Sequence, residues 1–442
     1  MPEISRKSPS RSIRQISPPD VAREAVPQSR NARRRMVEEP QHVDAGLVIT
    51  LVLMLCFGLV MLFSASMSES ISNVGGGTSY LFRQLLANVL GVVAIFFVTK
   101  FNIKIFDRPQ LAVFFYVLSL MLLVMTWFST PINGARRWLS VPLFGSFQPS
   151  ELFKVVVVYT LACYESWLNK ERAMGRFKRT RGFRGAMRGA WLDIMLPVII
   201  LGLPILVVFF QPHVSGVIIL SAVAIVCLLS AGLPLRSWIV SSIIGLLVLG
   251  ILIGAFIAFR PMLPEKIVSR FDHVVTRMEI FTDAEEATDD EYYQSRQALI
   301  AIGSGGLLGV GLGQGKQKNN YLPEGHNDYI FSNLVEELGM IGGIAVILLF
   351  LIFFILGLRV AFKASSVYAQ IVAGGISSLI TIQALLNIGV NVGAIPPTGI
   401  SLPFFSYGGT SNMFFLIGVG LLLNVSKYGL RKPDTAAVAE AR

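Results

Sequence analysis

Residues 341–358 read IGGIAVILLFLIFFILGL, eighteen residues without a charged side chain. An α-helix rises 1.5 Å per residue, so about 20 apolar residues cross the roughly 30 Å hydrocarbon core of a bilayer. A continuous apolar run of this length is neither a strand nor an amphipathic surface helix. The stretch therefore predicts a membrane-spanning helix.

Similar apolar runs recur along the chain. Of its 442 residues, 53% are hydrophobic and 15% charged, whereas soluble domains carry roughly 25% charged residues. We expect an all-α, polytopic membrane bundle of about ten transmembrane helices with a long, structured extracytoplasmic loop. The predicted spans lie near residues 46–66, 80–99, 108–129, 149–168, 191–210, 214–232, 236–259, 329–358, 369–393 and 411–426.

Basic residues predict the orientation, because Lys and Arg in short loops favour the cytoplasm. Residues 1–44 hold nine basic residues, and 167–190 hold eight against one acidic residue. The loops 67–79 and 394–410 hold no basic residue. Ten crossings with both termini in the cytoplasm satisfy this pattern. The exception is the pair Arg136–Arg137, which would lie outside.

Three regions follow from composition. Residues 1–44, rich in Ser, Pro and Arg, are typical of a disordered, basic cytoplasmic tail attracted to the lipid surface. Residues 45–430 form the transmembrane domain, with 260–328 as the large extracytoplasmic loop, and 431–442 form a cytoplasmic C-terminal tail. Cytoplasmic loops account for the net charge of +11, so no nucleic-acid partner is expected. The three cysteines lie in predicted helices without CxxC spacing, which indicates neither a disulfide framework nor a metal site.

The loop 260–328 contains two recognisable parts. Apolar residues recur at helical spacing within 264–281, which predicts an amphipathic helix on the membrane or on the bundle. An acidic run follows from Glu279 to Glu291, with seven carboxylates and no basic residue. Glycine-rich residues 303–315 then allow two interpretations, close backbone packing or contact with an anionic ligand.

Polar groups also occur at membrane depth. Glu151 and Lys154 share one face of a predicted helix, Glu336–Glu337 lie inside another, and Arg83–Gln84 open a third. Ionisable residues in membrane helices are costly, so they are either paired or functional. For Glu151 and Lys154 a structural ion pair is the simpler alternative. For the Glu336–Glu337 pair, hydrogen bonds between helices are at least as plausible as chemistry.

Six segments in order along the chain resemble the signature of the SEDS family, which includes FtsW, SpoVE and RodA. They are Asn133–Trp138, Phe147–Lys154, Ile302–Gly306 with Gly311–Gly313, Tyr321–Phe331, Glu336–Gly339 and Pro397–Gly409. The resemblance extends over about residues 45–430. The FSYGG sequence at 405–409 is closer to the FtsW/SpoVE branch than to RodA.

The resemblance implies a peptidoglycan glycosyltransferase that polymerises lipid II into β-1,4 glycan strands for septal or cell-wall synthesis, in the bacterial cytoplasmic (inner) membrane. The donor is held on undecaprenyl diphosphate and is displaced with inversion. The implied partners are a class B penicillin-binding protein, other divisome components and membrane lipid. No protein cofactor is implied, although a divalent cation on the substrate diphosphate stays open.

The same resemblance suggests site residues. An acidic side chain of the outer loop, Glu286 or else Asp283, would take the proton from the acceptor hydroxyl. The leaving diphosphate needs cations or N–H donors, for which Arg136, Arg137 and Lys154 are candidates. Further substrate contacts are expected from Glu151, His326, Asp328 and Ser406.

Two departures from the family pattern stand out. Members usually carry Gln-Pro-Asp after the fifth helix, whereas this chain has Gln211-Pro212-His213. Members also carry an Asp-Pro pair before a Tyr-Gln pair in the outer loop. Counting back from Tyr293–Gln294 places that aspartate at Ala287, beside Glu286. These departures keep open a catalytically silent scaffold of a division or sporulation complex. A lipid II flippase is the other alternative, because hydropathy and polar helix residues suit both a transporter and an enzyme, although the acidic, structured outer loop favours the enzyme.

The predicted topology can be tested by labelling single cysteines from outside the cell. Thr288 lies in the loop predicted to be outside, and Thr180 lies in the basic loop predicted to be inside. An impermeant maleimide should therefore modify a Thr288→Cys variant and spare a Thr180→Cys variant. The reverse pattern would contradict the topology and the location of the site.

Overall fold

The computed structural model describes residues 42–74, 78–131, 136–141, 145–180, 182–211, 213–260, 289–319 and 321–430. The predicted amphipathic helix 264–281 lies outside these residues, as do Asp283 and Glu286. Both expectations therefore stay predictions.

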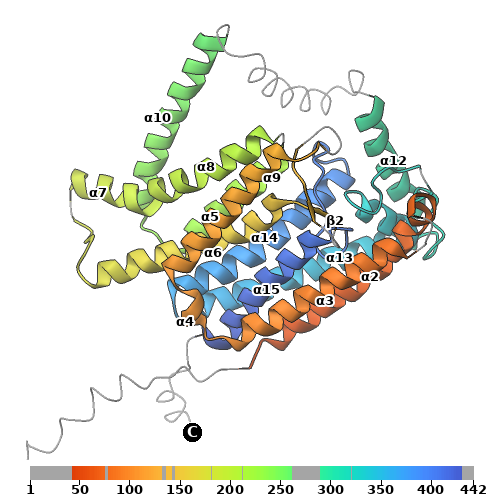
Figure 1. Cartoon of the computed structure of the whole chain (residues 1–442), viewed down its shortest axis with the longest axis horizontal. Helices are drawn as coiled ribbons and strands as arrows, with labels where there is room; N and C mark the ends of the chain where they lie inside the picture. Colours follow the sequence, from red (N-terminus) through yellow and green to blue (C-terminus); the bar gives the residue numbers. More distant parts are fainter. Residues whose placement is uncertain are drawn as a thin grey trace, which may run out of the picture. The chain divides into compact units, whose positions relative to one another are not determined.

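The described residues form an almost entirely helical bundle (Figure 1). Its α-helices are α2 (Ala45–Val74), α3 (Ser79–Lys100), α4 (Ile103–Phe106), α5 (Pro109–Met125), α6 (Pro149–Ala173), α7 (Phe183–Ala190), α8 (Leu196–Phe210), α9 (Val214–Ser230), α10 (Leu235–Phe259), α12 (Asp289–Gly305), α13 (Ile330–Phe362), α14 (Val367–Asn391) and α15 (Thr410–Tyr428). A 3-10 turn, η1 (Thr126–Phe128), follows α5, and a π-helical turn, η2 (Trp191–Met195), precedes α8.

Each of the ten predicted spans coincides with a helix, which confirms the all-α membrane fold. Within the described residues, eight helices are long and apolar enough to cross a membrane. The apolar helix α9 is shorter, at 17 residues. Helix α6 is not among these eight, because it carries the buried charged residues Glu151, Lys154 and Glu165. A small hairpin that the sequence did not predict joins η1 to α6, with β1 (Leu139–Val141) antiparallel to β2 (Gly145–Phe147).

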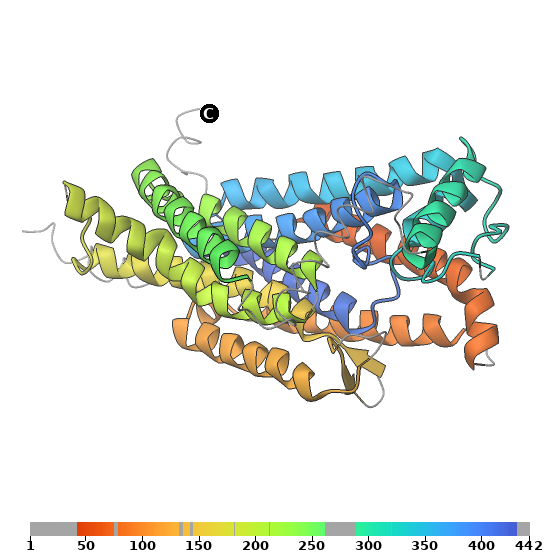
Figure 2. The ribbon, with the colours of Figure 1, turned by 90° about the horizontal axis from the view of Figure 1, so that it is seen from above.

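Helix α14 lies at the centre of the bundle. It packs against α6, α9, α13 and α15, and nearly all of its length is buried. Helix α3 lies alongside α15, and α2 lies alongside α13 (Figures 1 and 2). Helix α10 differs, because it packs on α7 and η2 near its start and exposes almost all of its remaining apolar surface.

Small residues let α3 and α15 approach closely, as is usual between membrane helices. A Cβ on Gly91 would lie 2.3 Å from Cδ1 of Leu416, so no larger residue fits there. At the end of α3, the side chain of Asn424 donates to the carbonyls of Val98 and Phe101, each at 2.7 Å. These bonds satisfy carbonyl groups that a helix end otherwise leaves unpaired.

Helix α13 is broken at Gly339, whose φ of +70° is left-handed. The loop after α12 supplies replacement hydrogen bonds on both sides of the break. Before it, the Glu336 and Glu337 carbonyls accept from the N–H groups of Val310 and Gly311, both at 3.0 Å. After it, the Met340 N–H donates to the Gly306 carbonyl at 2.9 Å.

Glycine is required where these two segments cross. A Cβ on Gly309 would lie 2.2 Å from the Glu337 carbonyl oxygen, and one on Gly339 would lie 2.3 Å from the Leu307 carbonyl oxygen. Of the two interpretations of the glycine-rich segment, the structure therefore shows close backbone packing.

The carboxylates of Glu336 and Glu337 hold the same loop against α2. Glu337 accepts from the Ser64 hydroxyl at 2.6 Å and pairs with the Lys318 ammonium at 2.6 Å. Glu336 accepts from the backbone N–H of Lys316 at 2.9 Å. Both glutamates are buried and hydrogen-bonded to protein groups. Of the two alternatives for this pair, the structure therefore shows hydrogen bonds between segments of the bundle.

The close approach at Gly309 yields a stability prediction. Gly309 and Gly313 have nearly equal φ values, +81° and +82°, so alanine at either site carries a similar backbone strain of about 1–2 kcal/mol. Only Gly309→Ala would also place a Cβ against a backbone carbonyl, since no described atom lies within 4 Å of a Cβ on Gly313. A thermal melt in detergent should give Gly309→Ala the lower melting temperature. Equal melting temperatures would show that the crossing tolerates a side chain.

Candidate functional site

The two arginines before the hairpin point to different partners. Nε of Arg137 donates to the Gln211 carbonyl at the end of α8, at 2.9 Å. The Gln211 side chain in turn donates to the Thr126 hydroxyl at 2.9 Å, which ties α8 to the end of α5. Arg136 is exposed and donates to the Trp127 carbonyl at 2.8 Å. Only Arg137 is therefore held at the junction of α8 and α9.

A buried ion pair lies in the first turns of α6. The Lys154 ammonium lies 2.7 Å from Oε1 of Glu151 and 2.7 Å from Oε1 of Gln383 on α14. The Gln383 amide donates to the Ser401 carbonyl at 3.1 Å, which connects the pair to the loop before α15. Oε2 of Glu151 is buried without a hydrogen-bond partner among the described residues. Glu151 and Lys154 thus form the structural ion pair that the sequence analysis gave as the simpler alternative. The pair leaves one oxygen of Glu151 able to accept a hydrogen bond.

His213, the residue that departs from the family pattern, lies beside these cations. It is buried at the start of α9, and a Cβ on Gly216 would lie only 2.0 Å from its ring. Desolvation, together with the charges of Arg137 and Lys154, holds the pKa of His213 well below its usual range. Its Nδ1 has no hydrogen-bond partner within the described part of the chain. A neutral imidazole in this position can exchange a hydrogen bond with a hydroxyl or amide group.

Asp328 is positioned by two asparagines of α14. Its carbonyl accepts from the side chains of Asn387 at 2.7 Å and Asn391 at 2.9 Å. Asn391 also accepts from the Ser332 hydroxyl in the first turn of α13, at 2.7 Å. Because the backbone is fixed in this way, the half-buried carboxylate of Asp328 has a defined place beside the loop before α15.

The surroundings of Asp328 disfavour its negative charge. Desolvation raises the pKa of this carboxyl to about 7. The neighbouring carboxylates of Glu324 and Glu151 act in the same direction, whereas His326 and Arg137 act against them. Glu151 and Arg137 therefore lie within electrostatic range of Asp328. A carboxyl group that titrates near neutral pH is suited to accept and release a proton.

Two further predicted residues support the loops around this cluster. The His326 ring is buried and lies 4.9 Å from the Tyr80 ring and 5.9 Å from the Tyr407 ring, centroid to centroid. The Ser406 hydroxyl is buried and donates to the Asn327 carbonyl at 2.6 Å. In this structure Ser406 therefore joins two loops, and substrate contact by His326 and Ser406 stays a prediction.

The structure thus brings together Arg137, Glu151, Lys154, His213 and Asp328 at one end of the bundle. We call these five residues the polar cluster. Arg136 lies apart on the surface, and Asp283 and Glu286 lie outside the described residues. No group of three or more potential metal ligands occurs among the residues that are described. The cluster combines two cations with two carboxyl groups, an arrangement that can bind a phosphate group and move a proton.

The amide side chains of α14 are the part of this site that the sequence analysis missed. Gln383, Asn387 and Asn391 recur at every fourth position, so they lie along one face of the helix. Uncharged amides in an otherwise apolar membrane helix commonly bond to neighbouring segments. Their spacing was therefore a signal for a polar face on this helix. Each of the three amides bonds to a residue or loop of the site.

Comparison with known proteins agrees with the all-helical membrane fold. Residues 45–430 match the family described as cell cycle protein, which joins FtsW, RodA and SpoVE. The chain is 35% identical over 388 residues to stage V sporulation protein E of Bacillus subtilis, covering 87% of this chain and 97% of that protein. It is 32% identical over 391 residues to a probable peptidoglycan glycosyltransferase FtsW of Geobacter metallireducens, covering 88% and 96%.

Solved structures show the same architecture. A chain of a peptidoglycan synthase complex that coordinates polymerization and crosslinking superposes with a TM-score of 0.62 at 25% identity, covering 87% of this chain and 97% of that one. The rod shape determining protein RodA of Thermus thermophilus superposes with a TM-score of 0.57 at 25% identity, covering 87% and 96%.

The fold and the family match together define a multi-pass membrane protein of the SEDS class. The chain belongs to the FtsW/RodA/SpoVE family. The FSYGG loop predicted the FtsW/SpoVE branch, and the two sequence relatives named above belong to that branch.

Proposed function

We propose that this chain is a peptidoglycan glycosyltransferase that polymerises lipid II at the polar cluster. The observation that carries the proposal is a carboxyl group with a pKa of about 7, Asp328, under the influence of the Arg137 cation and of Glu151, which pairs with Lys154. The family match over residues 45–430 supports the same activity. The glycan would form at the outer face of a bacterial cytoplasmic membrane, with both termini inside.

The cations are suited to the leaving group. When the donor sugar departs from undecaprenyl diphosphate, negative charge develops on the diphosphate oxygens, and fixed cations at that point lower the barrier. Lys154 has three N–H donors, of which Glu151 and Gln383 engage two. Because Lys154 is buried, its charge would act on the diphosphate across the site and not through direct contact. Arg137 adds a guanidinium group, which matches phosphate geometry.

The reaction is a single displacement. The acceptor hydroxyl oxygen attacks the anomeric carbon of the donor while the bond from that carbon to the diphosphate oxygen breaks. The hydroxyl proton passes to a carboxylate, and the bonding electrons leave with the diphosphate. An α-linked donor gives a β-linked product in one inversion, so no covalent enzyme intermediate is needed.

Two positions are candidates for the base. Glu286, with Asp283 as the alternative, lies in the acidic run where the family carries its aspartate. Asp328 is the second candidate, because its environment raises its pKa to about 7. A base is most effective when its pKa is near the working pH.

A class B penicillin-binding protein is the proposed partner, because a peptidoglycan synthase complex contains a chain of the same fold. Lipid II flipping and a silent scaffold are the competing functions. The defining experiment incubates purified lipid II with the purified protein, with and without that partner, and measures glycan chains. Glycan formation supports the enzyme. Lipid transfer across vesicles without glycan supports the flippase, and neither activity supports the scaffold.

The first functional prediction concerns the base. Glu286→Gln should lose about 10²–10⁴-fold in polymerisation rate, the usual contribution of a general base, while still binding lipid II. Glu285→Gln is the matched control in the same acidic run, and Asp283→Asn tests the alternative base. If all three variants polymerise at the parent rate, the base lies elsewhere.

A pH profile separates the second candidate from the first. If Asp328 is the base, its ionised form is active, so the parent rate rises as pH increases through about 7. Asp328→Asn should then be slow and lack that rise. A rise that persists in Asp328→Asn with an unchanged rate would remove Asp328 from proton transfer.

Alanine variants should separate the roles of the two arginines. Arg137→Ala should lower polymerisation strongly, because the leaving diphosphate loses a cation of the polar cluster. Arg136→Ala should lower it less, because that side chain is exposed and bonded to the Trp127 carbonyl. Thermal stability is measured in parallel, and Arg137→Lys should restore part of the rate by restoring the charge. An equal rate for Arg137→Ala and the parent would contradict this role.

A further inference from the structure

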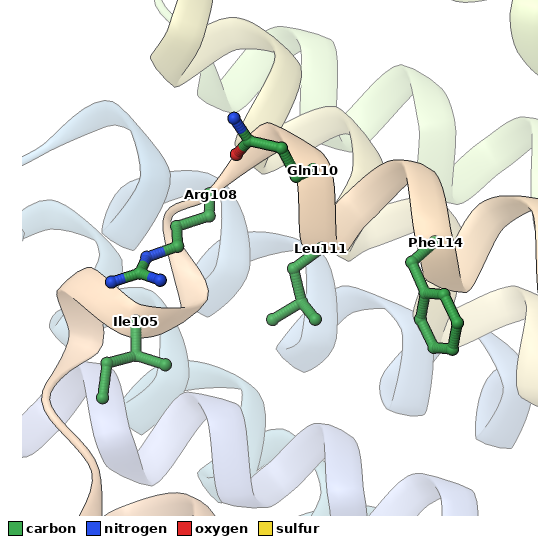
Figure 3. Close-up of a pocket in the computed structure, with 5 residues that line it drawn as sticks. All are labelled: Ile105, Arg108, Gln110, Leu111 and Phe114. Atoms are coloured by element: carbon green, nitrogen blue, oxygen red, sulfur yellow. The ribbon is translucent and has the colours of Figure 1, made fainter.

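A groove on the surface of the bundle lies where α4 meets α5, away from the polar cluster. It is open to the surface, has a volume of about 700 Å³ and is lined by Ile105, Arg108, Gln110, Leu111 and Phe114. Figure 3 shows Leu111 and Phe114 projecting from the same side of α5, while the Arg108 side chain extends over α4 toward Ile105. The groove therefore has a basic end and an apolar end. We refer to it as the α4–α5 groove.

The groove lies at the boundary between headgroups and acyl chains. Residues 109–128 form a candidate membrane span, and Arg108 immediately precedes its first residue. Leu111 and Phe114 lie in the first turns of that span. Leu111 is half-buried, whereas Phe114 and residues further along the span, such as Val117 and Met121, are exposed. An apolar helix face exposed in this way is covered by acyl chains when the protein is in a bilayer. The basic end of the groove then lies at the depth of the lipid phosphates.

The charge at this end is positive. The neighbouring carboxylate, Asp107, bonds to the Lys170 ammonium at 2.5 Å and accepts from the Ser166 hydroxyl at 3.1 Å. No ion pair to Arg108 occurs within the described residues, and its side chain is exposed. The N-terminus of α5 adds the partial positive charge of a helix end. An anionic group is thus favoured here over a neutral or zwitterionic one.

We propose that the α4–α5 groove binds one anionic glycerophospholipid. Its phosphate would accept charge-assisted hydrogen bonds from the Arg108 guanidinium, and the Gln110 amide would contact the glycerol headgroup. One acyl chain would lie against Ile105, Leu111 and Phe114. The combination of a cation at headgroup depth with an apolar wall below it matches this class of lipid and requires no other ligand.

The groove is connected to the helix that carries the ion pair of the polar cluster. The carbonyl of Phe106, at the end of α4, accepts from the Tyr159 hydroxyl of α6 at 2.6 Å. The bond between Asp107 and Lys170 joins the same turn to the end of α6. A lipid that holds α4 against α5 would therefore also stabilise the attachment of α6. Lipid binding should raise the melting temperature of the whole protein.

The experiment uses the purified full-length protein in detergent with phosphatidylglycerol and phosphatidylcholine in equal amounts. Native mass spectrometry counts the lipids retained, and thermal melting reports stabilisation by each lipid. The parent should retain phosphatidylglycerol preferentially and melt at a higher temperature with it. Arg108→Gln should weaken that binding about tenfold, as expected for the loss of a charge-assisted hydrogen bond. Arg108→Lys should keep most of the preference.

Two variants make the test specific to the groove. Lys363→Gln removes an equal charge from an exposed residue that does not line the groove, and it should leave the preference unchanged. Phe114→Ser should reduce retention of both lipids, because the acyl chain loses its wall. An equal loss in Lys363→Gln and Arg108→Gln would overturn the proposal in favour of diffuse charge attraction. Unchanged retention in Phe114→Ser would overturn it as well. None of these readouts depends on glycan synthesis, so the outcome is independent of the proposed function.

Discussion

The charge of Lys154 inside the bundle is the constraint on which the arrangement of the site depends. An ammonium group removed from water costs several kcal/mol unless another group compensates it. Here Glu151 supplies the opposite charge and Gln383 supplies a carbonyl oxygen, each at 2.7 Å. Since Gln383 must turn its oxygen to Lys154, its nitrogen faces Ser401. One buried charge thereby fixes α6, α14 and the loop before α15 relative to one another.

The remaining site residues depend on the same central helix. Polar side chains on one face of α14 hold the backbone of Asp328 and the first turn of α13. Arg137, His213 and Asp328 lie on irregular segments, whereas the amides that support the site lie on a regular, buried helix. A rigid element that supports functional groups carried on loops is a general solution for positioning those groups. It also explains why so much of the polarity of α14 is internal and makes no contact with solvent.

The sequence predicted the helices well because the length of an apolar run is a local property. The pairing of Glu151 with Lys154 was also accessible, since residues three apart share a helix face. Other features depend on distant segments. The break at Gly339 requires the glycine-rich loop to lie across it. The raised pKa of Asp328 depends first on burial by surrounding segments and then on the carboxylates of Glu324 and Glu151. Neither the helix break nor the raised pKa can be inferred from a single stretch of sequence. The asparagines of α14 are an intermediate case, because their spacing was visible and their partners were not.

The broken helix α13 has a consequence for how this protein can vary. Residues 306–311 provide donors and acceptors to backbone groups on either side of Gly339. Each such group, if left unpaired at membrane depth, costs several kcal/mol. The loop, although irregular in shape, therefore supplies the backbone hydrogen bonds that a continuous turn of helix would supply. Surface loops generally tolerate insertions and deletions, but the length of this one should be fixed, because gaining or losing a residue would misalign its hydrogen bonds with those of α13.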